Sequence, residues 1–183
     1  MVRYVALLRA INAGAGRTVK MRSIRQVFES LGFSNVTTFG ASGNIMFETR
    51  ARSERRLQRK IEKQLREAFG FQVATFIRTA AELAWTAEYQ PFSKSKVKTA
   101  DEFHIIFLSE RLDRKLSRKL RALQTETDEF RSQGRELFWL GRRKKDGSNF
   151  ATVPLEKALG RSLTIRSATT VKKLAAKYPP AKG

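Results

Sequence analysis

The chain contains no cysteine and only one histidine, His104. These absences exclude disulfide bonds, zinc fingers, thiol nucleophiles and any catalytic serine–histidine or cysteine–histidine pair that does not use His104. No pair of clustered aspartates indicates a magnesium site, so the sequence predicts neither a metal nor another cofactor. His104 lies between Phe103 and Ile105 in an apolar pattern, and we interpret it as a structural residue of a strand.

Long apolar runs are missing as well. The first apolar stretch, residues 5–8, stops at Arg9 and is far shorter than a membrane span or the core of a signal peptide. We therefore expect a cytoplasmic protein with no membrane partner. The hydrophobic content of 41% and the periodic spacing of apolar residues predict a packed core rather than a disordered chain.

Acidic residues are scarce relative to basic ones. The 183 residues include 37 Lys+Arg against 17 Asp+Glu, which gives a formal net charge of +20. This excess favours polyanionic partners, nucleic acid more than an anionic membrane surface. The alternative is a set of solvated basic faces without a ligand, because net charge bears on association and not on fold.

Apolar periodicity predicts the order strand, helix, strand, strand, helix, strand within residues 1–78. A further helix begins at Thr79, which forms a capping box with Glu82. The polar, lysine-rich segment 93–98 predicts a connector, and the same order of elements recurs after it. The expected fold is α+β with two ferredoxin-like (split βαβ) units in tandem. We expect an N-terminal ferredoxin-like unit over residues 1–91 and a second, irregular α+β unit with a terminal helix over residues 92–183.

This topology predicts a polar corner where the first strand ends beside the start of the third. Backbone N–H groups of a glycine loop, together with an arginine, amides and a hydroxyl, can hold a phosphate or a carboxylate. The alternative is that Asn12 and Asn44 only cap turns. The candidate ligand-binding residues are Arg9, Asn12, Gly14, Gly16, Arg17, Ser42, Gly43 and Asn44.

A set of short motifs is spread over residues 4–174. It consists of residues 4–9 with Ile11 and Asn12, Met21, residues 31–33, residues 42–44 with Phe47, residues 69–71, residues 107–109, residues 134–136, residues 155–160, Thr164, Arg166, Thr170, Val171, Lys173 and Leu174. These motifs resemble those of a bacterial family, the domain-of-unknown-function family 1697. The chain departs from the family pattern at Ala10, Gly40, Ala41, Asn149, Ser167 and Ala168. The resemblance implies a shared fold but no reaction. If the family shares one ligand, it also implies that the second half of this member has lost part of the polar set.

One other basic segment is a candidate for nucleic-acid contact. Arg142, Arg143, Lys144 and Lys145 form the densest basic run and follow two aromatic residues, Phe138 and Trp139. The run could grip phosphates while the aromatics stack on bases. The alternative is an exposed loop whose tryptophan packs in the core. The helix expected over residues 53–69 carries six cations opposite its apolar stripe, a pattern typical of a solvated face.

RNA-recognition modules share the βαββαβ order, and Tyr4 and Phe47 could occupy the positions of their stacking aromatics. The segment 42–47 matches the signature of such modules poorly.

From the polar corner and the basic charge we expect a protein that binds a phosphorylated or polyanionic ligand, nucleic acid included, at the polar corner. One alternative is a small-molecule enzyme that holds a substrate phosphate or carboxylate through Arg9, although no nucleophile–base pair is evident. Another is a basic structural protein without a dedicated ligand.

Overall fold

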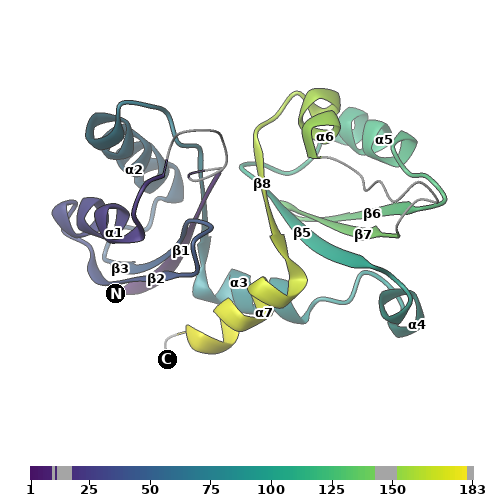
Figure 1. Ribbon diagram of the computed structural model, residues 1–183, viewed down its shortest axis with the longest axis horizontal. Coiled ribbons are helices and arrows are strands. Elements are labelled where there is room, and N and C mark those ends of the chain that lie inside the picture. Colours follow the sequence, from purple (N-terminus) through teal and green to yellow (C-terminus); the bar gives the residue numbers. More distant parts are fainter. Residues whose placement is uncertain (10, 12–17, 143–151, 181–183) are drawn as a thin grey trace. The chain divides into compact units, whose positions relative to one another are not determined.

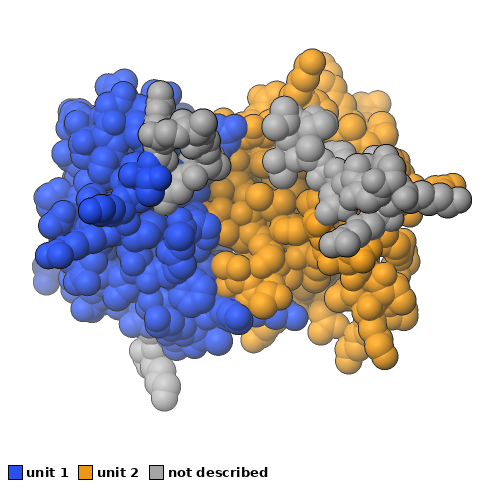
Figure 2. Space-filling view, in the orientation of Figure 1, with its two compact units in different colours: residues 1–87, 172–183 blue, residues 88–171 orange. Residues whose placement is uncertain are grey.

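The computed structural model describes residues 1–9, 11, 18–142 and 152–180. The chain forms two compact units, one made of residues 1–87 with 172–183 and the other of residues 88–171 (Figure 2). The fold is α+β, and each unit contains a four-stranded antiparallel sheet. Residues 172–183, which the sequence assigned to the second unit, are grouped with the first.

The first unit follows the predicted order strand, helix, strand, strand, helix, strand (Figure 1). Its sheet has the strand order β2-β3-β1-β4. The first helix after this sheet begins at the predicted capping box, in which the Thr79 N–H donates to Glu82 Oε2 at 2.9 Å and the Glu82 N–H donates to Thr79 Oγ1 at 3.1 Å. The elements are β1 Val2–Leu8, α1 Met21–Ser30, β2 Ser34–Phe39, β3 Asn44–Thr49, α2 Glu54–Phe69, β4 Thr75–Thr79 and α3 Ala80–Glu88.

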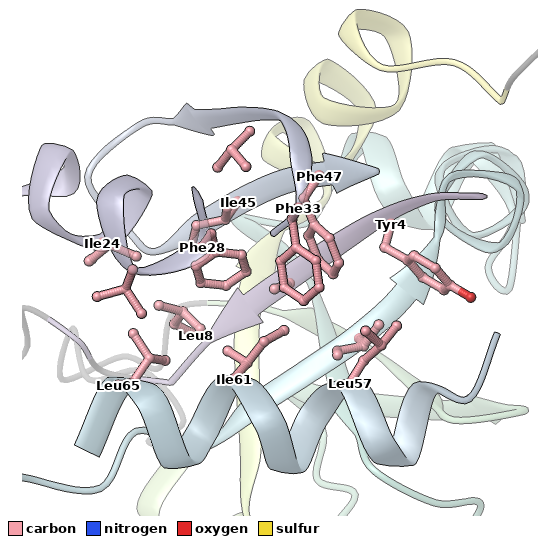
Figure 3. Close-up of a cluster of buried hydrophobic side chains, with 14 of the residues drawn as sticks. Tyr4, Leu8, Ile24, Phe28, Phe33, Ile45, Phe47, Leu57, Ile61 and Leu65 are labelled. Carbon is pink, nitrogen blue, oxygen red and sulfur yellow. The ribbon is translucent and has the colours of Figure 1, made fainter. Parts of the chain in front are cut away.

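Helices α1 and α2 cover one face of this sheet, and the hydrophobic core of the unit lies between the sheet and these two helices (Figure 3). Alternate residues of β1 (Tyr4, Ala6 and Leu8) point into this core because side chains of a strand alternate between its two faces. Helix α2 contributes a stripe of apolar residues at helical spacing, and Gly70 ends the helix in the left-handed conformation at φ +77°. The stripe consists of Leu57, Ile61 and Leu65.

The second unit repeats the order of elements, and its sheet has the strand order β6-β7-β5-β8. Its helices α5 and α6 pack against each other on one face of the sheet (Figure 1). The elements are α4 Lys94–Lys98, β5 Glu102–Leu108, α5 Arg114–Ala122, β6 Asp128–Gln133, β7 Glu136–Gly141, α6 Thr152–Leu159 and β8 Leu163–Ser167. Helix α7, Ala168–Lys177, follows β8, and its residues from Lys172 onward are grouped with the first unit.

The two sheets share the same strand register. The pair Leu7–Asn44 of β1 and β3 corresponds to the pair Phe107–Glu136 of β5 and β7. From these pairs the partners run in the same order along both pairs of strands. Likewise β1 pairs with β4 in the register that β5 has with β8. The hairpins differ, because four residues separate Phe39 from Asn44 whereas two separate Gln133 from Glu136.

The segment predicted as a connector, residues 93–98, contains a short helix, α4, that was not predicted from the sequence. The Ser93 side chain caps the helix by accepting from the Lys96 N–H at 3.4 Å. No residue of this helix is buried, so no apolar periodicity marked it in the sequence.

Candidate functional site

The end of β1 lies beside the start of β3 in the first unit. The Leu8 N–H donates to the Gly43 carbonyl at 2.8 Å, directly after the Leu7–Asn44 pair. On the other side, the Arg9 N–H donates to the Ala74 carbonyl at 2.9 Å. The backbone of this corner is thus held from both neighbouring segments, as the topology predicted.

Gly43 allows the close approach of the two segments. Its φ is +73°, and a Cβ added to it would lie 2.9 Å from Leu8 Cβ and 3.0 Å from Ile11 Cγ2. Only glycine fits both the backbone conformation and the space. Ile11, with 3% of its surface exposed, belongs to the core.

Asn44 closes the β2–β3 hairpin. Its side chain is fully buried, and its amide nitrogen donates to the Phe39 carbonyl at 2.9 Å and to Ser42 Oγ at 3.0 Å. These bonds use both hydrogens of the amide nitrogen. Asn44 therefore supports the turn and orients Ser42, which is the turn chemistry weighed from the sequence.

Two described side chains of the corner are exposed, those of Arg9 and Ser42. The Arg9 guanidinium and the Ser42 hydroxyl thus lie on the solvent side of the corner, whereas Gly43 and Asn44 are buried beneath its surface. The remaining predicted residues of this site, Asn12, Gly14, Gly16 and Arg17, lie outside the described residues.

The equivalent corner of the second unit has different chemistry. The Leu108 N–H donates to the Arg135 carbonyl at 2.9 Å, as Leu8 does to Gly43, but Glu136 takes the place of Asn44. Glu136 is 6% exposed, and its carboxylate accepts from the Arg135 N–H at 3.2 Å. A buried carboxylate disfavours a bound anion, so the two corners are not interchangeable.

Only Arg142 of the predicted basic run is described, and it is half-buried. Its N–H donates to the Thr127 carbonyl at 2.8 Å. Arg143, Lys144 and Lys145 lie outside the described residues. The neighbouring aromatics do not form an exposed stacking surface, because Phe138 is fully buried and Trp139 is 3% exposed, with its indole N–H bonded to Asp128 at 3.0 Å.

The aromatic residues compared with RNA-recognition modules are also buried. Tyr4 and Phe47 stack with ring centroids 5.7 Å apart in the core beneath the helices (Figure 3). They are 2% and 0% exposed, so they offer no platform for bases.

His104 occupies the position in β5 that Tyr4 has in β1. It stacks on Trp139 with ring centroids 5.1 Å apart, and its Nδ1 lies 3.5 Å from Glu102 Oε2 without a hydrogen bond. Burial lowers the pKa of His104, and the Glu102 carboxylate only partly opposes this shift. The imidazole is consequently neutral at pH 7 and packs as a structural residue.

Sequence reasoning missed two buried arginines, Arg78 and Arg166. They occupy the same register position: Arg78 of β4 pairs with Val5 of β1, and Arg166 of β8 pairs with Ile105 of β5. Arg78 is 1% exposed and Arg166 is 6% exposed, and burial lowers the pKa of Arg166 to about 10. Arg166 is among the positions that resemble the family, but arginine is usually read as a surface residue, so the sequence did not indicate that either side chain is buried.

The chain gives no sign of a metal centre or a membrane span where it is described. Among the described residues, no three His, Asp or Glu side chains gather closely enough to hold a metal ion. Within the same ranges, every helix is too short or too polar to cross a lipid bilayer.

The chain belongs to the family of proteins of unknown function DUF1697, whose model matches residues 1–138. The motif positions from residue 155 to Leu174, which also resemble this family, lie outside the matched region. A solved structure of a conserved bacterial protein from Streptococcus pneumoniae is similar over 96% of this chain and 97% of its own, with a TM-score of 0.71 and 23% sequence identity. This similarity shows the fold alone. No curated protein matches the chain.

Proposed function

We propose that the protein binds a phosphorylated or polyanionic ligand, nucleic acid included, at the corner between the end of β1 and the β2–β3 turn. One observation carries the proposal: the exposed Arg9 cation and Ser42 hydroxyl project from a backbone that Gly43 and Asn44 hold rigidly. A guanidinium is suited to phosphate because it can donate two parallel hydrogen bonds.

In this proposal each residue has a distinct role. Arg9 provides the charge, Ser42 a hydroxyl donor, and Asn44 positions Ser42 through the 3.0 Å bond to its Oγ. Gly43 brings the two segments together. The predicted contributions of Asn12, Gly14, Gly16 and Arg17 stay part of the proposal as backbone and side-chain donors of the glycine loop that the sequence predicts.

The small-molecule enzyme at the same corner is less well supported. Near this edge Glu62 is already engaged, because its Oε1 accepts from the Thr75 N–H at 2.8 Å and from Gln58 at 3.1 Å. The proposal therefore assigns binding and no reaction. It places the protein in the cytoplasm, where phosphorylated metabolites and nucleic acids occur.

We also infer that both units are ferredoxin-like (split βαβ) halves in tandem, with the boundary near residue 91. The shared strand order and the shared register support this. The shorter hairpin and the shorter helix α6 make the second half the irregular one.

The decisive test replaces Arg9 with methionine and uses Arg22→Met, an exposed arginine on α1, as the matched control. Phosphate, sulfate and nucleotides should raise the melting temperature of the unaltered protein and of Arg22→Met, since a ligand that binds only the native state stabilises it. Arg9→Met should melt at nearly the same temperature without ligand but bind about 10- to 100-fold more weakly, the loss of one charge-assisted contact of about 1.5–3 kcal/mol.

Two results would contradict the proposal. One is that no anion shifts the melting temperature of the unaltered protein. The other is that Arg9→Met lowers stability markedly without any change in ligand response, which would make Arg9 a structural strut of the turn.

A further inference from the structure

Helix α5 of the second unit exposes a strongly cationic face. Leu116 and Leu120 pack into the core of this unit, and the rest of the helix is polar. Its nine residues include five cations, all exposed, and no carboxylate. We call this surface the α5 basic face; its residues are Arg114, Lys115, Arg118, Lys119 and Arg121.

The fold itself does not require this charge. Helix α1, which follows the first strand in unit 1 as α5 does in unit 2, has two cations and Glu29, and Arg25 is paired with Glu29 at 2.7 Å. Helix α2 has six cations but also three glutamates, one of which, Glu67, pairs with Lys63. The α5 basic face is therefore not a general property of the helices in this chain.

The arrangement opposes helix stability. Arg114 with Arg118 and Lys115 with Lys119 are like charges four residues apart, and such pairs destabilise a helix. No ion pair with a described carboxylate relieves Arg114, Lys115 or Arg118. Asp113, the nearest acidic residue, caps the helix by accepting from the Leu116 N–H at 2.8 Å.

The chemistry of the face selects its partner. No aromatic residue occurs between Arg111 and Glu129, so the face has no surface on which the bases of a single strand could stack. The five cations lie within residues 114–121, which span about 12 Å of helix, and a nucleic acid duplex carries one phosphate charge per about 1.7 Å of its axis. The cations thus match a rigid array of phosphates rather than one small anion.

We propose that the α5 basic face docks on the phosphate backbone of a double-stranded nucleic acid, without reading its sequence. This interaction surface lies beyond the corner site and does not rest on it. Lys119 has a second role, because its Nζ also donates to the Ala158 carbonyl of α6 at 3.4 Å, so it is left unchanged in the test.

The test compares two triple variants of equal net charge. The first is Arg114→Gln, Lys115→Gln and Arg118→Gln on α5, and the matched control is Arg55→Gln, Arg56→Gln and Arg59→Gln on α2, where all three arginines are also exposed. Binding of a labelled DNA duplex, an RNA duplex, a single strand and phosphatidylserine vesicles is measured by fluorescence anisotropy or co-sedimentation against salt concentration.

Each lost phosphate contact lowers the slope of log affinity against log salt by about 0.9. The α5 variant should therefore lose up to about 2.7 of the slope, and on the order of 100-fold in duplex affinity at about 0.1 M salt, whereas the α2 variant should lose little. The α5 variant should also melt at or above the temperature of the unaltered protein because like-charge repulsion is removed.

Several outcomes would overturn the proposal. These are equal losses in the two triple variants, absence of duplex binding at about 50 mM salt, where such association is strong, or tighter binding of vesicles or single strands than of duplexes. Should the triple variant fail to fold, Arg118→Gln alone is used, and an unchanged salt slope then counts against the proposal. The α5 triple variant should keep the rise in melting temperature that inorganic phosphate and sulfate cause through the corner, which separates this test from that of the corner site.

Discussion

Gly43 shows how a single missing side chain sets the geometry of the corner. Its positive φ and its contact with the end of β1 are independent constraints, and both exclude a Cβ. The sequence could indicate the turn because glycines frame it. It could not indicate the contact with Leu8 and Ile11, which depends on how β1 continues beyond its pairing with β3.

We expect Gly43→Ala to lower the free energy of unfolding by about 2–4 kcal/mol, from the left-handed conformation and the overlap with Leu8 together. Gly40→Ala is the matched control, since Gly40 also has a positive φ, +63°, but open space around its Cβ position. It should cost only about 1–2 kcal/mol. Urea unfolding of the three proteins measures the difference, and equal losses would show that the overlap relaxes.

His104 offers a second prediction at this scale because it is the only histidine. Its pKa is lowered by burial, so the unfolded chain takes up a proton at higher pH than the folded one. Stability should be level just above the unfolded-state value of about 6.5 and should fall as the pH drops from there toward the folded-state pKa.

Replacing His104 by Phe keeps an aromatic ring beside Trp139, as Tyr4 lies beside Phe47 in the first unit. The variant should lose the fall in stability that begins at about pH 6.5, the part due to histidine. Urea unfolding at several pH values checks this, and an NMR titration of the single imidazole gives its pKa directly. A folded-state pKa above the ordinary value would contradict the prediction.

At the scale of elements, a glutamate of the helix between the third and fourth strands of each unit bonds to the fourth strand. Glu62 of α2 accepts from the Thr75 N–H at 2.8 Å, and Glu156 of α6 accepts from the Leu163 N–H at 3.1 Å. Thr75 and Leu163 occupy the same register position, facing Leu8 and Leu108. The acceptor is thus repeated although α2 and α6 differ in length.

We expect Glu62→Ala to lower the free energy of unfolding by about 1–3 kcal/mol, because a buried N–H would lose its acceptor. Glu62→Gln retains a carbonyl oxygen and should lose less than about 1 kcal/mol. Glu67→Ala on the same helix breaks only the exposed pair with Lys63 and should change stability by less than about 0.5 kcal/mol. Calorimetric melting of the three variants tests the order, and equal effects of Glu62→Ala and Glu67→Ala would refute it.

Elements with a buried apolar stripe could be predicted from the sequence, whereas those without one could not. The order of strands and helices in both units follows from spacing alone, and α2 begins after Ser53 as its capping pattern indicates. Helix α4 buries nothing and was missed. The buried Arg78 and Arg166 were missed for the opposite reason, since their environment is created only when the sheets assemble.

At the scale of the whole molecule, the repeated register is stronger evidence of an internal repeat than the letters of the sequence. Tyr4 and Phe47 correspond to His104 and Trp139, and both pairs stack although none of the four residues is identical to its counterpart. Charge does not follow this repeat, because α5 is far more cationic than α1. We infer that packing fixes the aromatic positions while the exposed helices are free to diverge.

The first unit is also discontinuous in the chain. Residues 172–183 belong with residues 1–87, and Arg3 Nη1 donates to the Pro179 carbonyl at 2.6 Å. During synthesis all of residues 88–171 therefore emerge from the ribosome before residues 172–183, the final segment of the first unit. Unit 2 has its whole sequence available while the nascent unit 1 still lacks its final segment, so unit 1 begins before unit 2 in the chain but can be completed only after it.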